Sequence, residues 1–259
     1  YDVDLDPDKE IQPMLGSKEG ILHITLAFCN PGDEVLLPDP GYPTYTAINK
    51  LLATKITYYP LCEDNGWQPD FDTLEKMDLS HVKLMWTNYP NMPTGGNARR
   101  DTYEKLVDFA RRHDIVIVND NPYSLILNDH PLSIMQVPGA KDCCIELNSM
   151  SKSFNMPGWR VAMAVSNPTY IGYILKVKSN IDNGCTFDPT QVGMFLWGKI
   201  PDKYTDVEQL TERVLHEAEV FITPGFIFGE NGKRYLRISL CAKKEQMEEA
   251  LRRVKEINW

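Results

Sequence analysis

A single lysine stands in a short polar stretch of the chain, SMSKSFNMPGWR (149–160), with an arginine eight positions after it. The amine of Lys152 can act as a nucleophile, and the guanidinium of Arg160 can bind an anion through two parallel hydrogen bonds. The plain alternative is a lysine on the surface, because most lysines are exposed. The other motifs of the chain have to decide between these two interpretations.

Further reactive side chains follow short apolar runs that are typical of strands. Asp120 and Tyr123 come after DIVIVN, Tyr42 comes after EVLLPDPG, and Asn91 lies in NYPNMPTG after VKLMWT. Ligands of open α/β sheets bind beyond the carboxyl ends of the strands. We therefore expect these side chains to meet at one edge of a sheet.

These residue types together suit pyridoxal phosphate. A lysine can form a Schiff base with its aldehyde, and a carboxylate can keep its ring nitrogen protonated, which makes the ring an electron sink. Its phosphate could bind at Ser17 and Lys18, where a Gly-Ser turn precedes an apolar helical pattern, or these two residues could simply cap that helix.

Apolar runs alternate with helical patterns over roughly the first 180 residues, which predicts an α/β fold with a mostly parallel sheet flanked by helices. The runs are continuously apolar, as in strands that are covered on both faces. The predicted strands are 34–40, 81–90, 114–123, 143–149 and 160–167. An amphipathic helix is predicted over 101–114, with Asp101 and Glu104 as a capping box, and another over 243–257.

Two domains are expected, a large one over 1–183 that carries the cofactor and a smaller C-terminal α+β domain over 184–259. At their junction the helical pattern KVKSNIDNG passes at once into the strand-like GCTFDPTQVGMFLWGKIP. We therefore expect that a segment between Gly184 and Cys185, and an N-terminal part of the large domain, are missing from this sequence.

The composition argues against several classes of partner. A net charge of −9 and a pI near 5.1 disfavour nucleic acid and anionic membrane surfaces, which attract clustered Lys and Arg. The six cysteines and five histidines lack the spacing of a zinc site, and no apolar run approaches the roughly 20 residues of a membrane span. We expect a cytoplasmic protein with reduced thiols and no metal.

The motifs resemble those of the class I/II pyridoxal-phosphate aminotransferases of fold type I. SMSKSFNMPGWR is similar to the family pattern S-x-S-K-x-x-x-x-x-G-x-R. In that family the lysine forms the Schiff base, and the first serine and the last arginine bind the phosphate. The resemblance thus implies these roles for Lys152, Ser149 and Arg160.

Three further segments carry the same resemblance. DNPY (120–123) is similar to the D-x-x-Y motif, which implies that Asp120 pairs with the ring nitrogen and Tyr123 with the ring hydroxyl. DPGYPTY (39–45) resembles the segment whose first tyrosine, here Tyr42, stacks on the ring. GENGKRYLRISL (229–240) resembles the segment whose arginine, here Arg237, clamps the substrate carboxylate. Taken alone, Arg237 could pair with an acid and Tyr42 could pack in a turn.

One position departs from the family. The pattern N-P-x-G places an asparagine directly before the proline, whereas this chain has Met92, whose thioether is only a weak acceptor. Two replacements stay open for the contact with the ring hydroxyl oxygen: Asn91 after a small backbone shift, or Tyr123 alone.

The resemblance runs from about residue 15 to the end and is nearest to the branch with LL-diaminopimelate, alanine and aspartate aminotransferases. It implies a homodimeric enzyme that moves an amino group between an amino acid and a 2-oxo acid through a Schiff base on Lys152. Because a fold does not settle a function, two alternatives stay open. They are a β-eliminating lyase or synthase on the same fold, and a non-catalytic regulatory protein that binds the cofactor.

Overall fold

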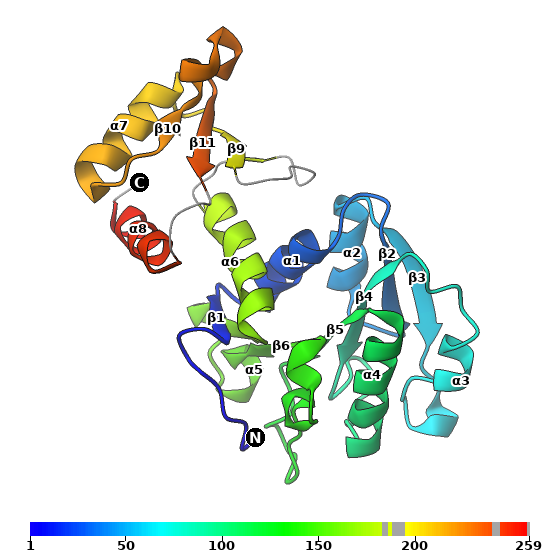
Figure 1. The fold of residues 1–259 in the computed structure, drawn as a ribbon. Helices are drawn as coiled ribbons and strands as arrows, with labels where there is room; N and C mark the ends of the chain where they lie inside the picture. The colour runs from blue at the N-terminus through cyan, green and yellow to red at the C-terminus, as the bar shows by residue number, and fades with distance from the viewer. Residues whose placement is uncertain (183–185, 188–194, 240–243, 258–259) are drawn as a thin grey trace. The chain divides into compact units, whose positions relative to one another are not determined.

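The computed structural model of the chain describes residues 1–182, 186–187, 195–239 and 244–257, and it divides into two compact units (Figure 1). The first unit spans 1–175 and the second 176–259. The domain boundary expected at 183/184, and the junction between Gly184 and Cys185, lie outside the described residues and stay predictions.

The first unit is built on a seven-stranded sheet with the order β1-β7-β6-β5-β4-β2-β3. The strands from β3 to β6 are parallel, while β7 is antiparallel to both β6 and β1, so the prediction of a mostly parallel sheet is confirmed. The strands are β1 (Ile11–Met14), β2 (Glu34–Asp39), β3 (Lys55–Pro60), β4 (Val82–Asn88), β5 (Val116–Asn121), β6 (Cys144–Ser149) and β7 (Ala162–Val165).

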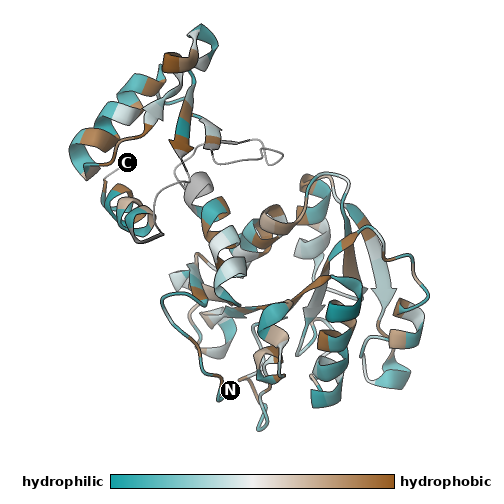
Figure 2. Ribbon diagram, viewed as in Figure 1, coloured by the Kyte–Doolittle hydropathy of each residue, from teal (hydrophilic) through white to brown (hydrophobic). Residues whose placement is uncertain are grey.

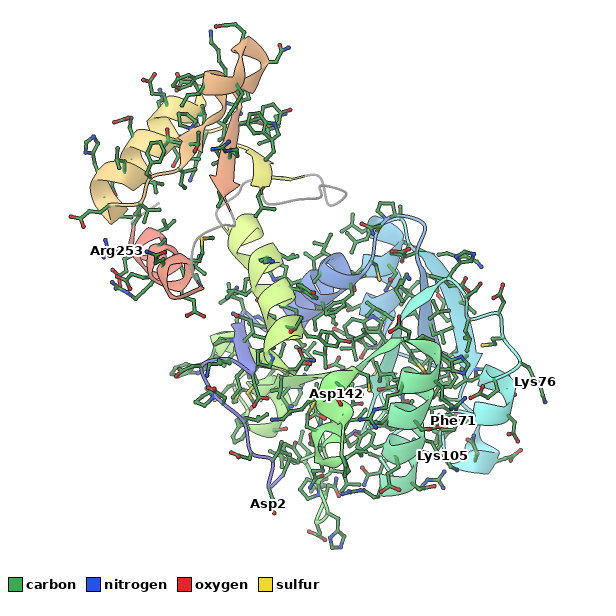
Figure 3. The ribbon with its side chains drawn as sticks, viewed as in Figure 1. Asp2, Phe71, Lys76, Lys105, Asp142 and Arg253 are labelled. Carbon is green, nitrogen blue, oxygen red and sulfur yellow. The ribbon has the colours of Figure 1, made fainter. Side chains whose placement is uncertain are left out.

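Helices connect these strands and cover the sheet. They are α1 (Ser17–Phe28), α2 (Pro43–Leu51), α3 (Phe71–Leu74), α4 (Arg100–His113), α5 (Met150–Ser153) and α6 (Pro168–Asp182), with 3₁₀ turns η1 (Glu63–Asn65), η2 (Ile134–Gln136), η3 (Ala140–Asp142) and η4 (Pro157–Trp159). Figure 2 shows hydrophobic residues along the central strands, whereas the outer side of α4 is hydrophilic. Lys105 belongs to this outer side (Figure 3).

Each face of the sheet has its own hydrophobic core. Leu36, Met85 and Ile117 pack with α4 on one face, whereas their strand neighbours Val35, Trp86 and Val118 pack with α1, α2 and α6 on the other. Successive side chains of a strand point to opposite faces, so a strand buried on both sides has to be apolar throughout. This explains the continuous apolar runs of the sequence.

Most of the predicted elements are present, with shorter ends. The five predicted strands correspond to β2, β4, β5, β6 and β7, and the predicted helix over 101–114 is α4. The capping box of Asp101 and Glu104 is wrong, because α4 begins at Arg100 and places Asp101 inside the first turn. Strands β1 and β3 were not predicted; both lie at sheet edges, where partial exposure interrupts the apolar pattern.

A buried polar network lies on the α4 face of the sheet. The carboxylate of Glu146 accepts hydrogen bonds from five groups: the side chains of Asn119, Asn121, Ser133 and Asn148, and the backbone N–H of Ile134. Burial raises the pKa of Glu146, and these donors oppose that shift. Because its acceptor positions are occupied by the protein's own donors, Glu146 serves to hold η2 on the sheet.

The second unit has a four-stranded antiparallel sheet with the order β10-β11-β9-β8. Its elements are β8 (Thr186–Phe187), β9 (Phe195–Lys199), β10 (Thr223–Pro224), β11 (Tyr235–Ser239), α7 (Val207–Ala218), α8 (Lys244–Glu256), η5 (Gly225–Phe228) and η6 (Glu230–Gly232). Apolar residues of α7, α8 and β11 form its core. The predicted C-terminal helix is therefore confirmed, and Arg253 near its end pairs with Glu249 and Glu219 (Figure 3).

The described parts of the chain contain neither a candidate membrane span nor a candidate metal site. None of the helices there is long and apolar enough to cross a membrane. No cluster of three or more His, Cys, Asp or Glu residues in those ranges could hold a metal ion.

Candidate active site

Most of the predicted site residues of the first unit line one cavity of about 280 Å³, here called the site cavity. Its lining residues are Ser17, Lys18, Tyr42, Asn88, Met92, Asp120, Pro122, Tyr123, Ser149, Ser151, Lys152, Pro157 and Arg160. A larger hollow of about 540 Å³ lies against α2 and β3 and shares only Tyr42 with it. The lysine and the aspartate singled out from the sequence therefore belong to the same cavity.

Strand register explains why these residues meet. Asn88 at the end of β4 lies opposite Asp120 near the end of β5, and Asp120 lies opposite Leu147 of β6. Ser149 follows Leu147 by two positions, so its side chain shares the face of Leu147. All three polar side chains thus lie at the carboxyl ends of parallel strands, on the face covered by α1 and α2.

The carboxyl group of Asp120 is fully buried, and among the described residues only one of its two oxygens has a hydrogen-bond partner. The hydroxyl of Tyr45 donates to Oδ2 at 2.8 Å, whereas Oδ1 is buried and has no hydrogen-bond partner among the described residues. Burial raises the pKa of Asp120 to about 7, and the Tyr45 hydrogen bond opposes that shift. A cationic donor beside Oδ1 would stabilise the ionised form.

Lys152 is placed by the short helix α5, which begins directly after β6. The side chain of Ser149 accepts a hydrogen bond from the backbone N–H of Ser151 at 3.3 Å and so caps this turn. Ser153 donates to the carbonyl of Pro122 at 3.0 Å. This second bond ties the lysine turn to the loop that follows β5 and carries Tyr123.

Where α1 begins, Gly16 and Arg160 come close together in a corner that suits an anion. Gly16 precedes the helix with φ +87°, a conformation that favours glycine, and a Cβ there would lie 2.1 Å from Nη2 of Arg160. Gly16 therefore lets the guanidinium approach the chain. Ser17 and Lys18, in the first turn of α1, line the same cavity, and the positive end of the helix dipole lies at this turn.

Asn91, which was expected at the cofactor ring, is not among the lining residues of the site cavity. It is buried outside the site cavity, where its Oδ1 accepts hydrogen bonds from the backbone N–H and the hydroxyl of Thr94. The amide that does line the cavity is Asn88, which the sequence analysis missed. Asn88 donates to the backbone carbonyl of Asp120 at 2.8 Å and accepts from the N–H of Met92 at 2.7 Å.

Tyr42 and Tyr123 both line the site cavity. Tyr42 immediately precedes α2, and its ring packs edge to face against Tyr45 with 5.5 Å between the ring centroids. Burial is the main cause of a raised pKa for Tyr123, followed by the charge of Asp120. The Tyr123 hydroxyl therefore stays protonated near neutral pH and can donate a hydrogen bond.

Arg237 belongs to the second unit and is described within it. It lies on β11, between β9 and β10, with Trp197 as its register partner. Its guanidinium carbon lies 4.7 Å from the ring centre of Phe228, a cation–π contact, and Phe228 packs edge to face on Trp197. These two rings limit the directions that the Arg237 side chain can take.

Comparison with known proteins connects this geometry to a family. The family model "Aminotransferase class I and II" matches residues 1–192 and 181–254. The LL-diaminopimelate aminotransferase of Aquifex aeolicus is 39% identical over 302 aligned residues, which cover 99% of this chain and 78% of the relative. The chain belongs to the class I and II aminotransferase family. A second relative of the same name, from Oleidesulfovibrio alaskensis, is 36% identical over 98% of the chain and 77% of the relative.

Solved structures agree with this assignment. Substrate-bound BacF from Bacillus subtilis has 32% sequence identity and a TM-score of 0.64, covering 100% of this chain and 77% of that one. A probable N-succinyldiaminopimelate aminotransferase from Thermus thermophilus has 28% identity and a TM-score of 0.65, with 98% and 79% covered. Both the expected fold type I architecture and the expected aminotransferase activity are thereby confirmed.

As an aminotransferase of this family, the protein uses pyridoxal phosphate to move an amino group between an amino acid and a 2-oxo acid. The residues of the site cavity fit this cofactor. The buried, unpaired Oδ1 of Asp120 suits a protonated ring nitrogen, and the corner of Gly16 and Arg160 suits a phosphate. A lysine, Lys152, lines the same cavity.

Replacing Asp120 by asparagine in protein freed of cofactor is expected to change how stability depends on pH. Asp120 has a raised pKa in the folded state, about 7 against 3.8 when unperturbed, so folding favours its protonated form. The free energy of unfolding of the unmodified protein should fall as the pH rises between these two values, by on the order of 4 kcal/mol in total. Asp120→Asn removes this loss, so its advantage should grow from pH 4 to pH 7 and then level off.

Urea unfolding at a series of pH values measures the effect. The exposed Asp142→Asn on the protein surface (Figure 3) serves as the control and should change stability by no more than about 0.5 kcal/mol. A constant difference between Asp120→Asn and the unmodified protein across this pH range would contradict the description of Asp120 as a buried, unpaired acid.

Proposed function

We propose that Lys152 is the residue that binds the cofactor aldehyde and that Asp120 binds its ring nitrogen. The observation that supports this assignment best is that Lys152 and Asp120 line the same cavity, and that Oδ1 of Asp120 is buried without a hydrogen-bond partner among the described residues. In the same proposal Tyr42 covers one face of the ring and Tyr123 binds its hydroxyl oxygen. The phosphate is bound by Ser17, Lys18, Ser149 and Arg160.

When bound, pyridoxal phosphate supplies an aldehyde carbon for amines and a ring that takes up electrons from the substrate's α-carbon. Asp120, as a carboxylate, holds the positive charge of the ring nitrogen that this chemistry needs. Lys152 Nζ, once the substrate amine has displaced it, takes the proton from the α-carbon. Proton transfer by a positioned base typically accelerates a reaction about 10²- to 10⁴-fold. Arg237 binds the substrate carboxylate through two parallel hydrogen bonds.

For the amino donor we propose LL-diaminopimelate. The support comes from the two relatives described above, which carry that name and are 39% and 36% identical to this chain. The solved neighbours have other names, including an aromatic aminotransferase of Pyrococcus horikoshii at 25% identity. Because Arg237 recognises a carboxylate that every amino acid has, the choice of donor depends on contacts beyond that group.

We also propose that the enzyme works as a homodimer in the cytoplasm. Three large apolar side chains near the lysine motif are exposed in the single chain: Leu15, Phe154 and Trp159. A second copy of the chain could cover them. The free thiols of Cys29, Cys62, Cys143 and Cys144 agree with a reducing compartment.

The domain boundary near 183/184 and the missing segment there remain part of the proposal. The alignment with the Aquifex aeolicus relative runs over 302 residues although this chain has 259, so the relative contains residues that have no counterpart here. The two ranges matched by the family model overlap at 181–192. The alignment length supports a missing segment, and the overlap of the two matched ranges supports its position near 184/185.

Lys152→Ala is expected to lower transamination by at least 10²-fold while the protein can still bind the cofactor without a covalent bond. Reduction with sodium borohydride makes a lysine–aldehyde adduct permanent, so mass spectrometry of the digested enzyme should find the cofactor on the peptide with Lys152. Lys105→Ala, on the exposed side of α4, is the matched control and should keep both label and activity. Normal transamination by Lys152→Ala would reject the assignment.

Gly16→Ala is expected to weaken cofactor binding. An added Cβ would displace the Arg160 guanidinium and would force a side chain into a positive φ, so at least one charge-assisted phosphate contact should be lost. The dissociation constant, measured by absorbance titration, should rise roughly 10- to 100-fold. Gly172→Ala in α6, where the new Cβ meets no described atom within 4 Å beyond the backbone of its own helix and its chain neighbours, should change it by less than about twofold. Equal effects of the two substitutions would contradict the role of Arg160.

A screen of amino donors against 2-oxo acids tests the proposed substrate. LL-diaminopimelate should give the highest kcat/KM, measured by the 2-oxo product formed. A preference for aromatic donors, or for N-succinylated diaminopimelate, would overturn the choice of donor and leave the aminotransferase activity intact. Pyruvate and ammonia formed from a β-substituted amino acid, without any transfer, would instead point to a lyase.

A further inference from the structure

Tyr45 of α2 is a fully buried residue that contacts Asp120 directly. Its hydroxyl donates to Oδ2 of Asp120 at 2.8 Å, across 75 positions of sequence. Its ring stacks on Trp86 with 5.0 Å between centroids and an interplanar angle of 20°, and it packs edge to face on Tyr42. Tyr45 thus touches both the acid expected at the ring nitrogen and the tyrosine expected on the ring face.

We propose that Tyr45 is a positioning residue that fixes which oxygen of Asp120 faces the cofactor. This inference rests on the proposed function, in which Asp120 binds the ring nitrogen. Tyr45 itself lies behind Asp120 and Tyr42 and is not a lining residue of the site cavity, so it acts through them.

The geometry explains how this positioning works. The two oxygens of a carboxylate are chemically equal, and the terminal torsion of an aspartate has broad minima, so an unsupported Asp120 could turn either oxygen to the cavity. The Tyr45 hydroxyl occupies Oδ2 and leaves Oδ1 as the acceptor that is still available. The backbone of Asp120 is fixed as well, since Asn88 donates to its carbonyl at 2.8 Å.

The position of Tyr45 is itself well determined. The side chain of Asn49, one helical turn later, donates to the Tyr45 carbonyl at 2.9 Å, and the Thr54 hydroxyl donates to Oδ1 of Asn49 at 2.7 Å. With the ring held against Trp86, the hydroxyl has little freedom to move away from Asp120. Because Tyr45 is held in place in this way, its hydrogen bond can fix the orientation of the Asp120 carboxyl group.

Tyr45 also affects the charge of Asp120. Burial raises the pKa of Asp120, and the Tyr45 hydrogen bond lowers it. The other ionisable side chains that line the cavity are Lys18, Tyr42, Tyr123, Lys152 and Arg160. Removing the hydroxyl should therefore raise the pKa of Asp120 further and leave less of the carboxylate that the ring nitrogen needs.

Tyr45→Phe tests the proposal, with Tyr59→Phe as its matched control. Tyr59 is also fully buried, and its hydroxyl donates to the backbone carbonyl of Trp86 at 2.7 Å. Both substitutions remove one buried hydroxyl next to Trp86, but only the first removes a contact to Asp120. The two variants therefore separate a role in positioning from a general effect on the core.

The first measurement follows the infrared band of the protonated Asp120 carboxyl in protein freed of cofactor, identified by its loss in Asp120→Asn. Tyr45→Phe should raise the pH midpoint of this band by about one to two units, because a hydrogen bond to a charged group is lost. Tyr59→Phe should leave the midpoint unchanged. Equal midpoints in Tyr45→Phe and the unmodified protein would overturn the proposal.

The second measurement is the dissociation constant of pyridoxal phosphate at neutral pH. Tyr45→Phe should raise it about tenfold, and Tyr59→Phe by less than about twofold. If Asp120→Asn itself binds the cofactor normally, the role of Asp120 in the proposed function fails. If Asp120→Asn binds weakly and Tyr45→Phe binds normally, only the role of Tyr45 is refuted.

A failure of Tyr45→Phe to fold would be informative when Asp120→Asn folds. The double variant Tyr45→Phe/Asp120→Asn then decides, because it removes the buried charge together with its donor. Recovery of folded protein in the double variant, seen by circular dichroism, would support a specific pair of Tyr45 and Asp120. The absence of recovery would contradict it.

Discussion

The site depends on one buried carboxyl group whose second oxygen is left for a ligand. The carboxyl group of Asp120 is fully enclosed, yet within the described residues only Tyr45 donates to this group, and its Oδ1 stays unpaired. Burial of a carboxylate without full compensation lowers the stability of a fold. In the proposed site, a cationic ring nitrogen placed at Oδ1 would offset this cost. The interaction proposed to bind the cofactor would then also stabilise its charged, electron-accepting form.

A comparison of the two buried acids of the sheet supports this view. Glu146 lies on the neighbouring strand but on the opposite face, and five groups of the protein donate to it. Asp120 lies on the α2 face and receives one such bond. Alternation along parallel strands thus separates a carboxyl that holds the fold together from one that is kept available. The number of donors distinguishes their roles better than burial does.

The parts of the site that could be predicted are the residues at or just after the ends of apolar strands, because these strands are recognisable in the sequence. Asp120 and Lys152 were expected to meet because one lies near the carboxyl end of an apolar strand and the other just beyond the next strand, and parallel strands bring their carboxyl ends together. Both residues line the site cavity. Tyr45 could not be predicted, since its importance arises from a contact with a residue 75 positions away. Asn91 does not line the cavity, and its Oδ1 instead accepts a hydrogen bond from Thr94, a local contact that the sequence pattern does not indicate. The N-cap of α4 is Arg99, two residues before Asp101, so Asp101 and Glu104 cannot form the capping box.

The departure at Met92 leads to a specific consequence for the cofactor's ring hydroxyl. Met92 lines the site cavity at the position where the family has an asparagine. Asn91 is engaged with Thr94 outside the cavity, and Asn88 already donates to the Asp120 carbonyl and accepts from the Met92 N–H. Of the two replacements that the sequence left open, the geometry therefore favours Tyr123. Its hydroxyl, kept protonated by burial, can donate to the ring oxygen without disturbing the bonds that hold Asp120 in place.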